Sequence, residues 1–301
     1  MNPDPGPDCG SAPAPDPAPA PDPAPAPAPD PDPAPHPGPG PDPAPDPALV
    51  LVAHGSRDPR ALATVRALAA QVRALRPALR VHLGHLELNA PLLPDTLAAL
   101  GDTEEAVLVP LLLGRGHHVT RDLPETAAAR PRTPRTPRPR TTVAAPLGPH
   151  PLLTDALHTR LTEAGWPVHL TERERRTAGV VLAAAGSLAP GSAADTTRAA
   201  HLLSARLGVP VLPAYASAAR PTIPEAVTAL TALGRPRTAL ASYFTAPGRL
   251  AGQCANHFPG AASAPLGTHP AMARLILERY REAIPAHGPV RHDPTGAAYC
   301  Q

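Results

Sequence analysis

Two histidines that each follow a short apolar run are the first candidates for chemistry. His54 comes directly after 48–53, in His-Gly-Ser-Arg-Asp, and His118 follows the run at 106–112, in Gly-Arg-Gly-His-His-Val. Two imidazoles without a nearby cysteine cluster suit a borderline divalent ion such as Fe²⁺, Co²⁺ or Ni²⁺. Glu87 ends another predicted strand and could add a carboxylate. The sequence therefore indicates a metal site made of His54, Glu87 and His118.

Each of these groups also has an ordinary structural explanation. In a chain with 14 histidines, any single one is more often a surface or hydrogen-bonded side chain, and Glu87 could be a charge at a strand end. His117 competes directly with His118. Successive residues of an extended loop point in opposite directions, so only one of the two is expected to face the site.

The elements that would position these residues alternate between strand and helix. We expect strands at 48–53, 80–87, 106–112 and 142–145, and helices at 61–75, 92–100, from about 122, and at 151–164. Such alternation predicts a parallel sheet covered on both faces, in which ligands bind beyond the carboxyl ends of the strands. The Pro- and Arg-rich stretch 130–140 cannot be helix and is expected to be an exposed insertion.

The same pattern starts again about 130 residues later. The paired segments are 49–56 with 180–187, 90–95 with 220–225, and 145–151 with 264–270. A tandem duplication predicts an α/β fold of two similar parallel-sheet units, with four main strands each, facing across one cleft. We therefore divide the chain into a tail at 1–47, a first half at 48–170 carrying the metal site, a second half at 171–283, and a C-terminal tail at 284–301.

The N-terminal segment differs in composition from everything that follows it. Residues 1–47 repeat Ala, Pro and Asp with almost no large apolar side chain, which predicts disorder with polyproline II character. They contain eight acidic residues and no arginine, so the remainder carries a charge of about +10. A basic body suits an anionic ligand, either nucleic acid or a polycarboxylate. Aromatic residues make up only 2% of the chain, so platforms for stacking bases are scarce.

Several function classes are excluded or disfavoured by composition. All 27 basic residues are arginine, so neither a P-loop lysine nor a Schiff-base lysine exists. Cys9, Cys254 and Cys300 are far apart, which argues against a disulfide scaffold or a zinc knuckle. No apolar run approaches 18 residues and the N-terminus lacks a signal-peptide pattern, so we expect a cytoplasmic protein that acts without a membrane.

Three segments of the first half together resemble the sirohydrochlorin chelatase family. They are Leu-Val-Ala-His-Gly-Ser-Arg-Asp-Pro at 51–59, Leu-Glu-Leu-Asn-Ala-Pro-Leu-Leu at 86–93, and Val-Pro-Leu-Leu-Leu-Gly-Arg-Gly-His-His-Val-Thr-Arg-Asp-Leu-Pro-Glu at 109–125. The resemblance extends from about residue 48 to about 283 and is weaker in the second half. It implies an ATP-independent lyase that inserts Fe²⁺ or Co²⁺ into sirohydrochlorin, for siroheme or cobalamin biosynthesis, with no cofactor beyond the substrate metal.

The resemblance also assigns roles to individual residues. It implies that His54 and His118 bind the metal and help to remove the pyrrole protons, that Glu87 touches the metal, and that His117 is the variable position. In the second half Ala185, Ser217 and Leu250 stand at or near the places of these three ligands, which implies one active site per chain.

The expected partner is the tetrapyrrole, which resembles an eightfold carboxylate. Three arginines flank the histidines and could bind its carboxylates with bidentate geometry: Arg57, Arg115 and Arg121. We expect no nucleic-acid partner, and a monomer, because fusing two halves removes one reason to dimerise.

Three alternatives remain open. A metal-binding chaperone could use the same two histidines without any macrocycle chemistry. A hydrolase based on Ser56 is weaker, because the G-x-S-x-G motif is missing. A nucleic-acid-binding module built on the arginines of 130–140 is weaker still.

Overall fold

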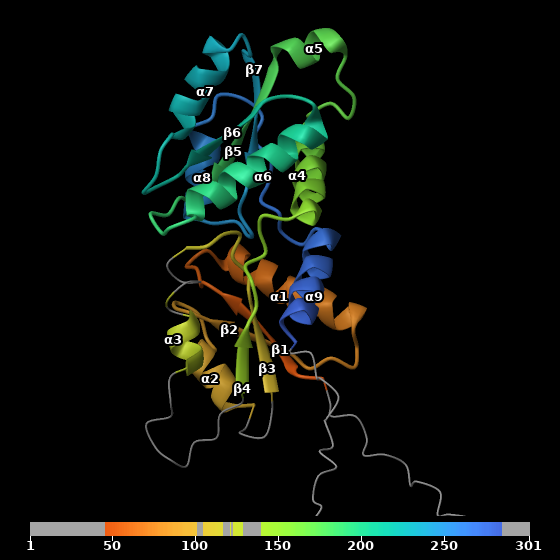
Figure 1. The fold of residues 1–301 in the computed structure, drawn as a ribbon, viewed down its shortest axis with the longest axis vertical. Coiled ribbons are helices and arrows are strands. Elements are labelled where there is room, and N and C mark those ends of the chain that lie inside the picture. Colours follow the sequence, from red (N-terminus) through yellow and green to blue (C-terminus); the bar gives the residue numbers. More distant parts are fainter. Residues whose placement is uncertain (1–45, 101–104, 117–120, 122, 129–139, 285–301) are drawn as a thin grey trace, which may run out of the picture. The chain divides into compact units, whose positions relative to one another are not determined.

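Two parallel sheets organise the chain in the computed structural model, which describes residues 46–100, 105–116, 121, 123–128 and 140–284. The first half has the sheet order β2-β1-β3-β4, and the second half has the order β6-β5-β7. All neighbouring strands run parallel, as the alternation of strand and helix predicts (Figure 1). Residues 1–45 of the disordered segment expected at 1–47, and nearly all of the 130–140 insertion, lie outside the described residues.

The first sheet brings the ends of three strands to one edge. Its strands are β1 (Ala48–Ala53), β2 (Val81–His85), β3 (Glu105–Pro110) and β4 (Arg140–Val143). Ala53 is in register with His85, and Val52 is in register with Pro110. Residues that directly follow β1, β2 and β3 therefore start from neighbouring points on the carboxyl edge of this sheet.

The second sheet has one strand fewer than we expected. Its strands are β5 (Ala178–Ala184), β6 (Val211–Tyr215) and β7 (Arg237–Ser242). Within the fully described stretch 178–284, the place of a fourth strand is taken by a single bridge between Leu240 and Ala262. The expectation of four strands in each half was thus wrong for this half. β4 contains Thr-Thr-Val, whereas 261–263 reads Ala-Ala-Ser, and such small side chains have low strand propensity and little surface to pack.

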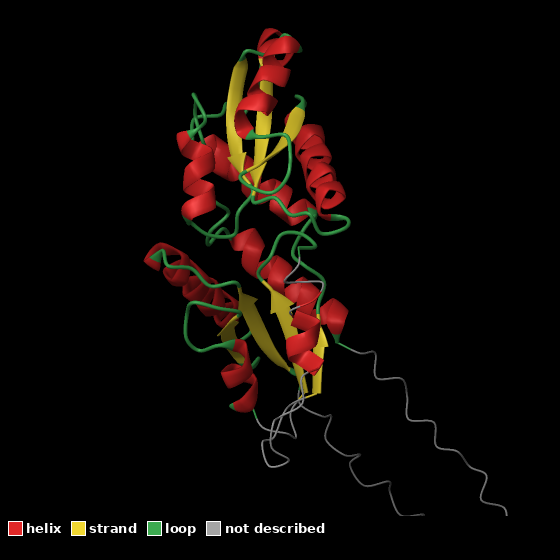
Figure 2. Ribbon diagram, turned by 90° about the vertical axis from the view of Figure 1, so that its left-hand side faces the viewer, coloured by secondary structure: helices red, strands yellow, loops and turns green. Residues whose placement is uncertain are grey.

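Helices cover both faces of each sheet (Figure 2). The helices of the first half are α1 (Pro59–Leu75), α2 (Leu93–Ala98), α3 (Leu123–Ala128) and α4 (Pro151–Glu163). Those of the second half are α5 (Glu172–Thr177), α6 (Ser192–Leu207), α7 (Ile223–Ala232), α8 (Arg249–Asn256) and α9 (Pro270–Ala283). Because both faces are covered, β1 is buried along its whole length, with Leu49 and Leu51 in one core and Val50 and Val52 in another.

The last helix of each half packs against the sheet of the other half. α4 follows the first sheet in sequence but contacts α6 and β7, while α9 follows the second sheet but contacts α1 and β3 (Figure 1). One buried cluster consequently runs through both halves, from Leu49 and Val65 to Val180 and Leu203. This exchange means that neither half buries its own sheet completely without the helix of the other.

The exchanged helices are attached in the same way on both sides. Arg160 of α4 donates to the carbonyl oxygen of Leu266, at 3.1 Å from Nη2, and Arg279 of α9 donates to that of Pro146, at 2.9 Å from Nε. Both carbonyl groups belong to the repeated Ala-Pro-Leu-Gly turns. The His-Pro pairs that follow these turns begin the two helices: His150 accepts from the N–H of Leu152 and His269 from that of Ala271, each at 3.2 Å. These two repeated histidines are thus helix caps.

No helix among the described residues is long and apolar enough to cross a membrane.

Candidate metal centre

His54 lies on a turn that only glycine permits. Gly55 has φ +104°, and a Cβ atom on it would lie 1.8 Å from the carbonyl oxygen of Glu87. The absence of that atom lets the segments after β1 and β2 lie against each other, and the N–H of Glu87 donates to the carbonyl oxygen of His54 at 3.0 Å. The turn is held further by Asn89, whose Oδ1 accepts from the N–H of Ser56 at 2.7 Å.

The structure brings two of the three predicted ligands together. Nδ1 of His54 lies 3.2 Å from Oε1 of Glu87, and the two side chains are 40% and 53% exposed. A carboxylate beside one ring nitrogen can fix the tautomer of a metal-binding histidine, so that the ion binds at Nε2. The same carboxylate could instead bind the ion directly. Either arrangement would put His54 and Glu87 at one divalent site.

The third predicted ligand, His118, and its neighbour His117 lie outside the described residues. Within the described part of the chain, no group of three His, Cys, Asp or Glu side chains gathers in a way that could hold a metal. The described segment Gly114–Gly116 does follow β3, which is the strand next to β1. The role of His118 therefore remains a prediction from the sequence.

The three arginines proposed to bind carboxylates have different surroundings. Arg57 is exposed and forms no ion pair with any described residue. Arg121 contacts Glu125 at 2.9 Å on the exposed surface. Arg115 donates from Nε and Nη2 to Asp195 of the second half, at 2.9 and 2.7 Å. Arg57 thus has its whole guanidinium group available to an anion, whereas Arg115 has only part of its group.

The second half repeats the backbone of this site with other side chains. The N–H of Ser217 donates to the carbonyl oxygen of Ala185 at 3.0 Å, as Glu87 does to His54. Gly186 has φ +90°, and a Cβ atom on it would lie 1.9 Å from the carbonyl oxygen of Ser217. Leu250 lies in the first turn of α8. Neither Ala185 nor Leu250 can bind a metal through its side chain, so the turn is kept while the candidate ligands are absent.

Two polar residues near the candidate site were not anticipated from the sequence. Asp195 is one, because nothing in its local pattern indicates an ion pair with a residue 80 positions away. The other is His85, which is 1% exposed and has Nδ1 3.1 Å from the carbonyl oxygen of Pro91. Its Nε2 has no hydrogen-bond partner within the described residues. The sequence signal for His85 is its place at the end of β2.

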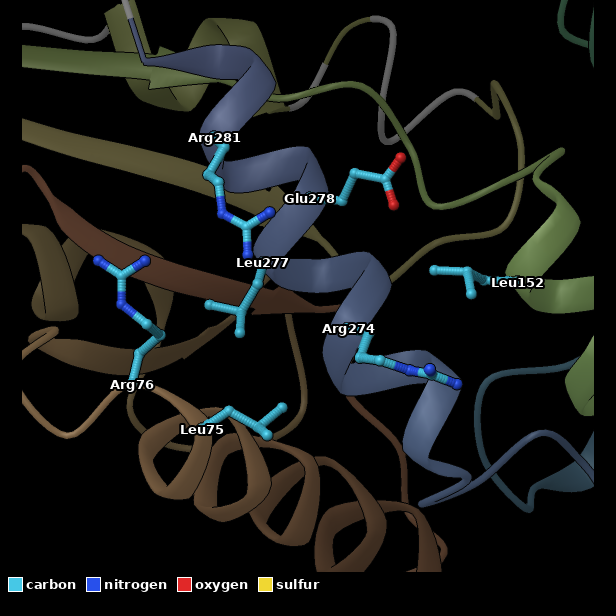
Figure 3. A pocket seen from close by; sticks show the side chains of 7 residues that line it. All are labelled: Leu75, Arg76, Leu152, Arg274, Leu277, Glu278 and Arg281. Carbon is cyan, nitrogen blue, oxygen red and sulfur yellow. The ribbon is translucent and has the colours of Figure 1, made fainter.

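Elsewhere on the molecule, a hollow of about 360 Å³ has three arginine side chains in its lining. Figure 3 shows Arg76 and Arg281 projecting toward it from the end of α1 and from α9, above the apolar side chains of Leu75 and Leu277. Arg76 also pairs at 3.2 Å with Asp46, two residues before the start of β1. The end of the hollow with Arg76 is therefore at the amino edge of the first sheet, opposite the edge that carries His54.

Comparison with known proteins agrees with the resemblance seen in the sequence. The chain is 35% identical over 80 residues to the sirohydrochlorin cobaltochelatase of Methanococcus maripaludis, an alignment that spans 56% of that relative and 26% of this chain. It is 29% identical over 123 residues to the sirohydrochlorin cobaltochelatase of Methanococcoides burtonii, covering 94% of that relative and 38% of this chain.

Solved structures match over a longer stretch. SirB from Bacillus subtilis with Fe³⁺ superposes with a TM-score of 0.62 at 26% identity, covering 79% of this chain and 95% of that one. The sirohydrochlorin chelatase SirB in complex with cobalt superposes with a TM-score of 0.60 at 25% identity, with the same coverage of both chains. The CbiX family model matches residues 48–164 and again residues 179–283, which together exceed half of the chain. The chain therefore belongs to the CbiX family, with two copies of the family's domain in tandem.

Proposed function

We propose that this protein inserts Fe²⁺ or Co²⁺ into sirohydrochlorin. The observation that carries the proposal is the pair of His54 and Glu87 at the carboxyl edge of the first sheet, at 3.2 Å, in a chain whose second copy keeps the turn and lacks the ligands. The names of the relatives and of the SirB structures support sirohydrochlorin as the substrate, and iron and cobalt as the metals.

The reaction replaces two pyrrole N–H protons by one M²⁺ ion. In the proposed mechanism His54 and His118 deliver the ion from one face of the macrocycle, and Glu87 either binds the ion or orients His54. Once the ion has left it, one of the imidazoles accepts one pyrrole proton as general base, and solvent water takes the second. The macrocycle must pucker so that its nitrogen lone pairs reach the ion, and two walls that grip the ring would stabilise the distorted form.

The two halves would have different tasks. We propose that the first half, 48–170, carries the metal site and that the second half, 171–283, provides the opposite wall of a single cleft. Arg57 and the uncommitted part of Arg115 would bind the substrate carboxylates, with Arg121 as a third candidate. The chain would act as a monomer on the free tetrapyrrole, and the substrate metal would be the only ion required.

Anaerobic absorption spectroscopy of sirohydrochlorin tests this proposal. The full chain should change the sirohydrochlorin spectrum to that of the metal complex with Fe²⁺ or with Co²⁺, without ATP, faster than metal and substrate alone. The matched control is His54→Ala. A chain that binds Co²⁺ tightly but does not accelerate metalation would instead identify the alternative, a metal-binding chaperone.

A further inference from the structure

His85 joins the two ends of the loop that carries Glu87. Its backbone N–H donates to the carbonyl oxygen of Pro91 at 3.0 Å, and Nδ1 of its ring lies 3.1 Å from the same oxygen. A carbonyl oxygen can only accept a hydrogen bond, so Nδ1 carries the proton in this contact. One residue thus holds the far end of the loop twice, through its main chain and through its side chain.

The loop between these two ends lies directly against the turn of His54. The N–H of Leu86 donates to the carbonyl oxygen of Ala53 at 2.9 Å, and the N–H of Glu87 donates to that of His54 at 3.0 Å. The Glu87 carboxylate reaches Nδ1 of His54 at 3.2 Å from this backbone. The segment that presents the carboxylate is therefore the same segment that His85 closes.

A strained residue follows Glu87 in this loop. Leu88 has φ +64°, in the left-handed region that residues with a Cβ atom adopt only at a cost in energy. It is also 53% exposed, so the packing of its side chain does little to hold that conformation. Such a conformation persists only where the surrounding structure enforces it. The backbone beside Glu87 consequently depends on the hydrogen bonds that hold the loop, and the Nδ1 bond of His85 is one of them.

The second half has the same loop without this side-chain bond. The N–H of Tyr215 donates to the carbonyl oxygen of Pro221 at 2.9 Å, and Ala218 has φ +59°. Tyr215 ends β6 as His85 ends β2, but its ring has no nitrogen that could donate to the carbonyl group. The backbone of the loop therefore forms with tyrosine at this place, and the imidazole is an addition in the half that has Glu87.

An imidazole at this position is a poor choice for the core alone. His85 is 1% exposed, and in the described part of the chain nothing forms a hydrogen bond with its Nε2. A buried polar atom without a partner destabilises the folded state, whereas an apolar ring of similar size would avoid that cost. The structure explains the imidazole by its other nitrogen, which binds the end of the Glu87 loop.

We propose that His85 is a positioning residue for Glu87: its Nδ1 bond to Pro91 fixes the loop that holds the carboxylate beside His54, and so strengthens metal binding. The inference rests on the proposed metal site and concerns only how Glu87 is presented to His54. His85 acts through Glu87 and not as a ligand, because Nδ1 is bonded to the carbonyl group and Nε2 is buried.

The test exchanges the residues of the two halves at this place. His85→Tyr introduces the residue of the second half and removes the Nδ1 bond, whereas His85→Asn keeps a side-chain N–H donor close to the position of Nδ1. Co²⁺ affinity is measured on the chain alone from the visible d–d absorption of the bound ion, and the KM for Co²⁺ is measured with sirohydrochlorin. We expect His85→Tyr to weaken Co²⁺ binding and to raise this KM by about tenfold, as loss of a supporting group around a metal site does. His85→Asn should retain most of the affinity, and Tyr215→His, the matched change in the second half, should leave it unchanged.

A double-mutant cycle shows whether His85 acts through Glu87. The Glu87→Gln chain already lacks the carboxylate, so adding His85→Tyr should weaken Co²⁺ binding no further. An equally large further loss in that chain would mean that His85 supports the fold in general, and it would overturn the inference. Wild-type Co²⁺ affinity in a folded His85→Tyr chain would overturn it too, as would an asparagine variant as weak as the tyrosine variant.

Two further outcomes are distinguishable from these. If His85→Tyr does not fold, His85→Leu takes its place in the same cycle, since leucine also removes the donor and is smaller than tyrosine. A wild-type chain that binds Co²⁺ but leaves sirohydrochlorin unmetalated would refute the proposed function, while the cycle of Co²⁺ affinities still decides the role of His85.

Discussion

The two halves of this chain share a backbone and differ in the side chains at its turns. After the first strand of each half, a glycine with positive φ lets two segments touch, and the same N–H to carbonyl hydrogen bond closes the turn at 3.0 Å in both. In the first half the turn presents His54 and Glu87, whose side chains face each other. In the second it presents Ala185 and Ser217, and the hydroxyl of Ser217 bonds to the backbone instead. The fold therefore needs the turn but does not need the imidazole and the carboxylate on it.

The comparison of the two halves also helps to tell polar residues with a structural role from candidate metal ligands. His150 and His269 occur in both copies and cap the exchanged helices, and Arg160 and Arg279 occur in both copies and attach those helices to the opposite turn. Residues that the duplication has kept in pairs have equivalent structural contacts. His54 has no counterpart of its own kind, which is why it is the better candidate for a metal ligand than the histidines of the repeated motif.

Removing a histidine from the first half should have the largest effect. Each of His54→Ala and His118→Ala removes a proposed ligand and a candidate proton acceptor, so the rate of metal insertion should fall by about 100-fold or more. Leu250→Ala removes no ligating group and should leave the rate within about twofold. The measurement is the initial rate of metalation followed by absorption, on variants whose circular dichroism matches the wild type.

The number of metal ions bound per chain tests whether the first half alone has a metal site. One Co²⁺ ion per chain, lost in the His54→Ala/His118→Ala variant, agrees with a single site in the first half. Two ions per chain, or rapid metalation by the double variant, would mean that the second half has a site of its own with ligands such as His257 or Cys254.

Replacement of the carboxylate should have a smaller effect than replacement of a histidine. Glu87→Gln keeps the size of the side chain but removes the charge beside Nδ1 of His54, so metal affinity should fall by about 10- to 100-fold. Ser217→Ala is the matched change in the second half and should be silent in the same Co²⁺ titration. Equal effects of the two changes would contradict the proposed asymmetry.

The arginines allow a comparison between two edges of the first sheet. Arg57→Gln removes an exposed cation near His54 that pairs with no described residue, and it should raise the KM for sirohydrochlorin by about fivefold, the size expected for a solvent-exposed ion pair. Arg281→Gln makes the same change in the hollow at the amino edge and should leave that KM within about twofold. A larger effect at Arg281 would indicate that the tetrapyrrole binds at the hollow.

Local pattern was sufficient to predict the four strands of the first half and the duplication, because parallel strands buried on both faces are continuous apolar runs. The same pattern predicted that His54 and Glu87 lie close together, because the two residues come at the ends of neighbouring strands. The exchange of α4 and α9 was not predictable, because an amphipathic helix shows that one face is buried but not against which sheet. The Arg115–Asp195 pair was hidden for a similar reason: each residue resembles an ordinary surface charge until the two halves pack.

The smallest effect is expected from deletion of the N-terminal segment. The first residues with described contacts are Asp46, which pairs with Arg76 at 3.2 Å, and Pro47, whose carbonyl oxygen accepts from the hydroxyl of Tyr280 at 2.6 Å. Both contacts lie at the amino edge of the first sheet, opposite the edge with His54, and the deletion should therefore end at residue 45.

A chain without residues 2–45 should metalate sirohydrochlorin within about twofold of the wild-type rate, because its site and both halves are intact. Tyr280→Phe is a useful companion variant: it loses a buried hydrogen bond and should reduce the free energy of unfolding by about 1 kcal/mol without changing the rate. Thermal unfolding and initial rates, measured side by side, distinguish the two changes. A tenfold slower rate in a deletion variant that unfolds at the wild-type temperature would show that the acidic segment acts on the reaction. It would contradict the view that the amino edge of this sheet has no part in the chemistry at the carboxyl edge.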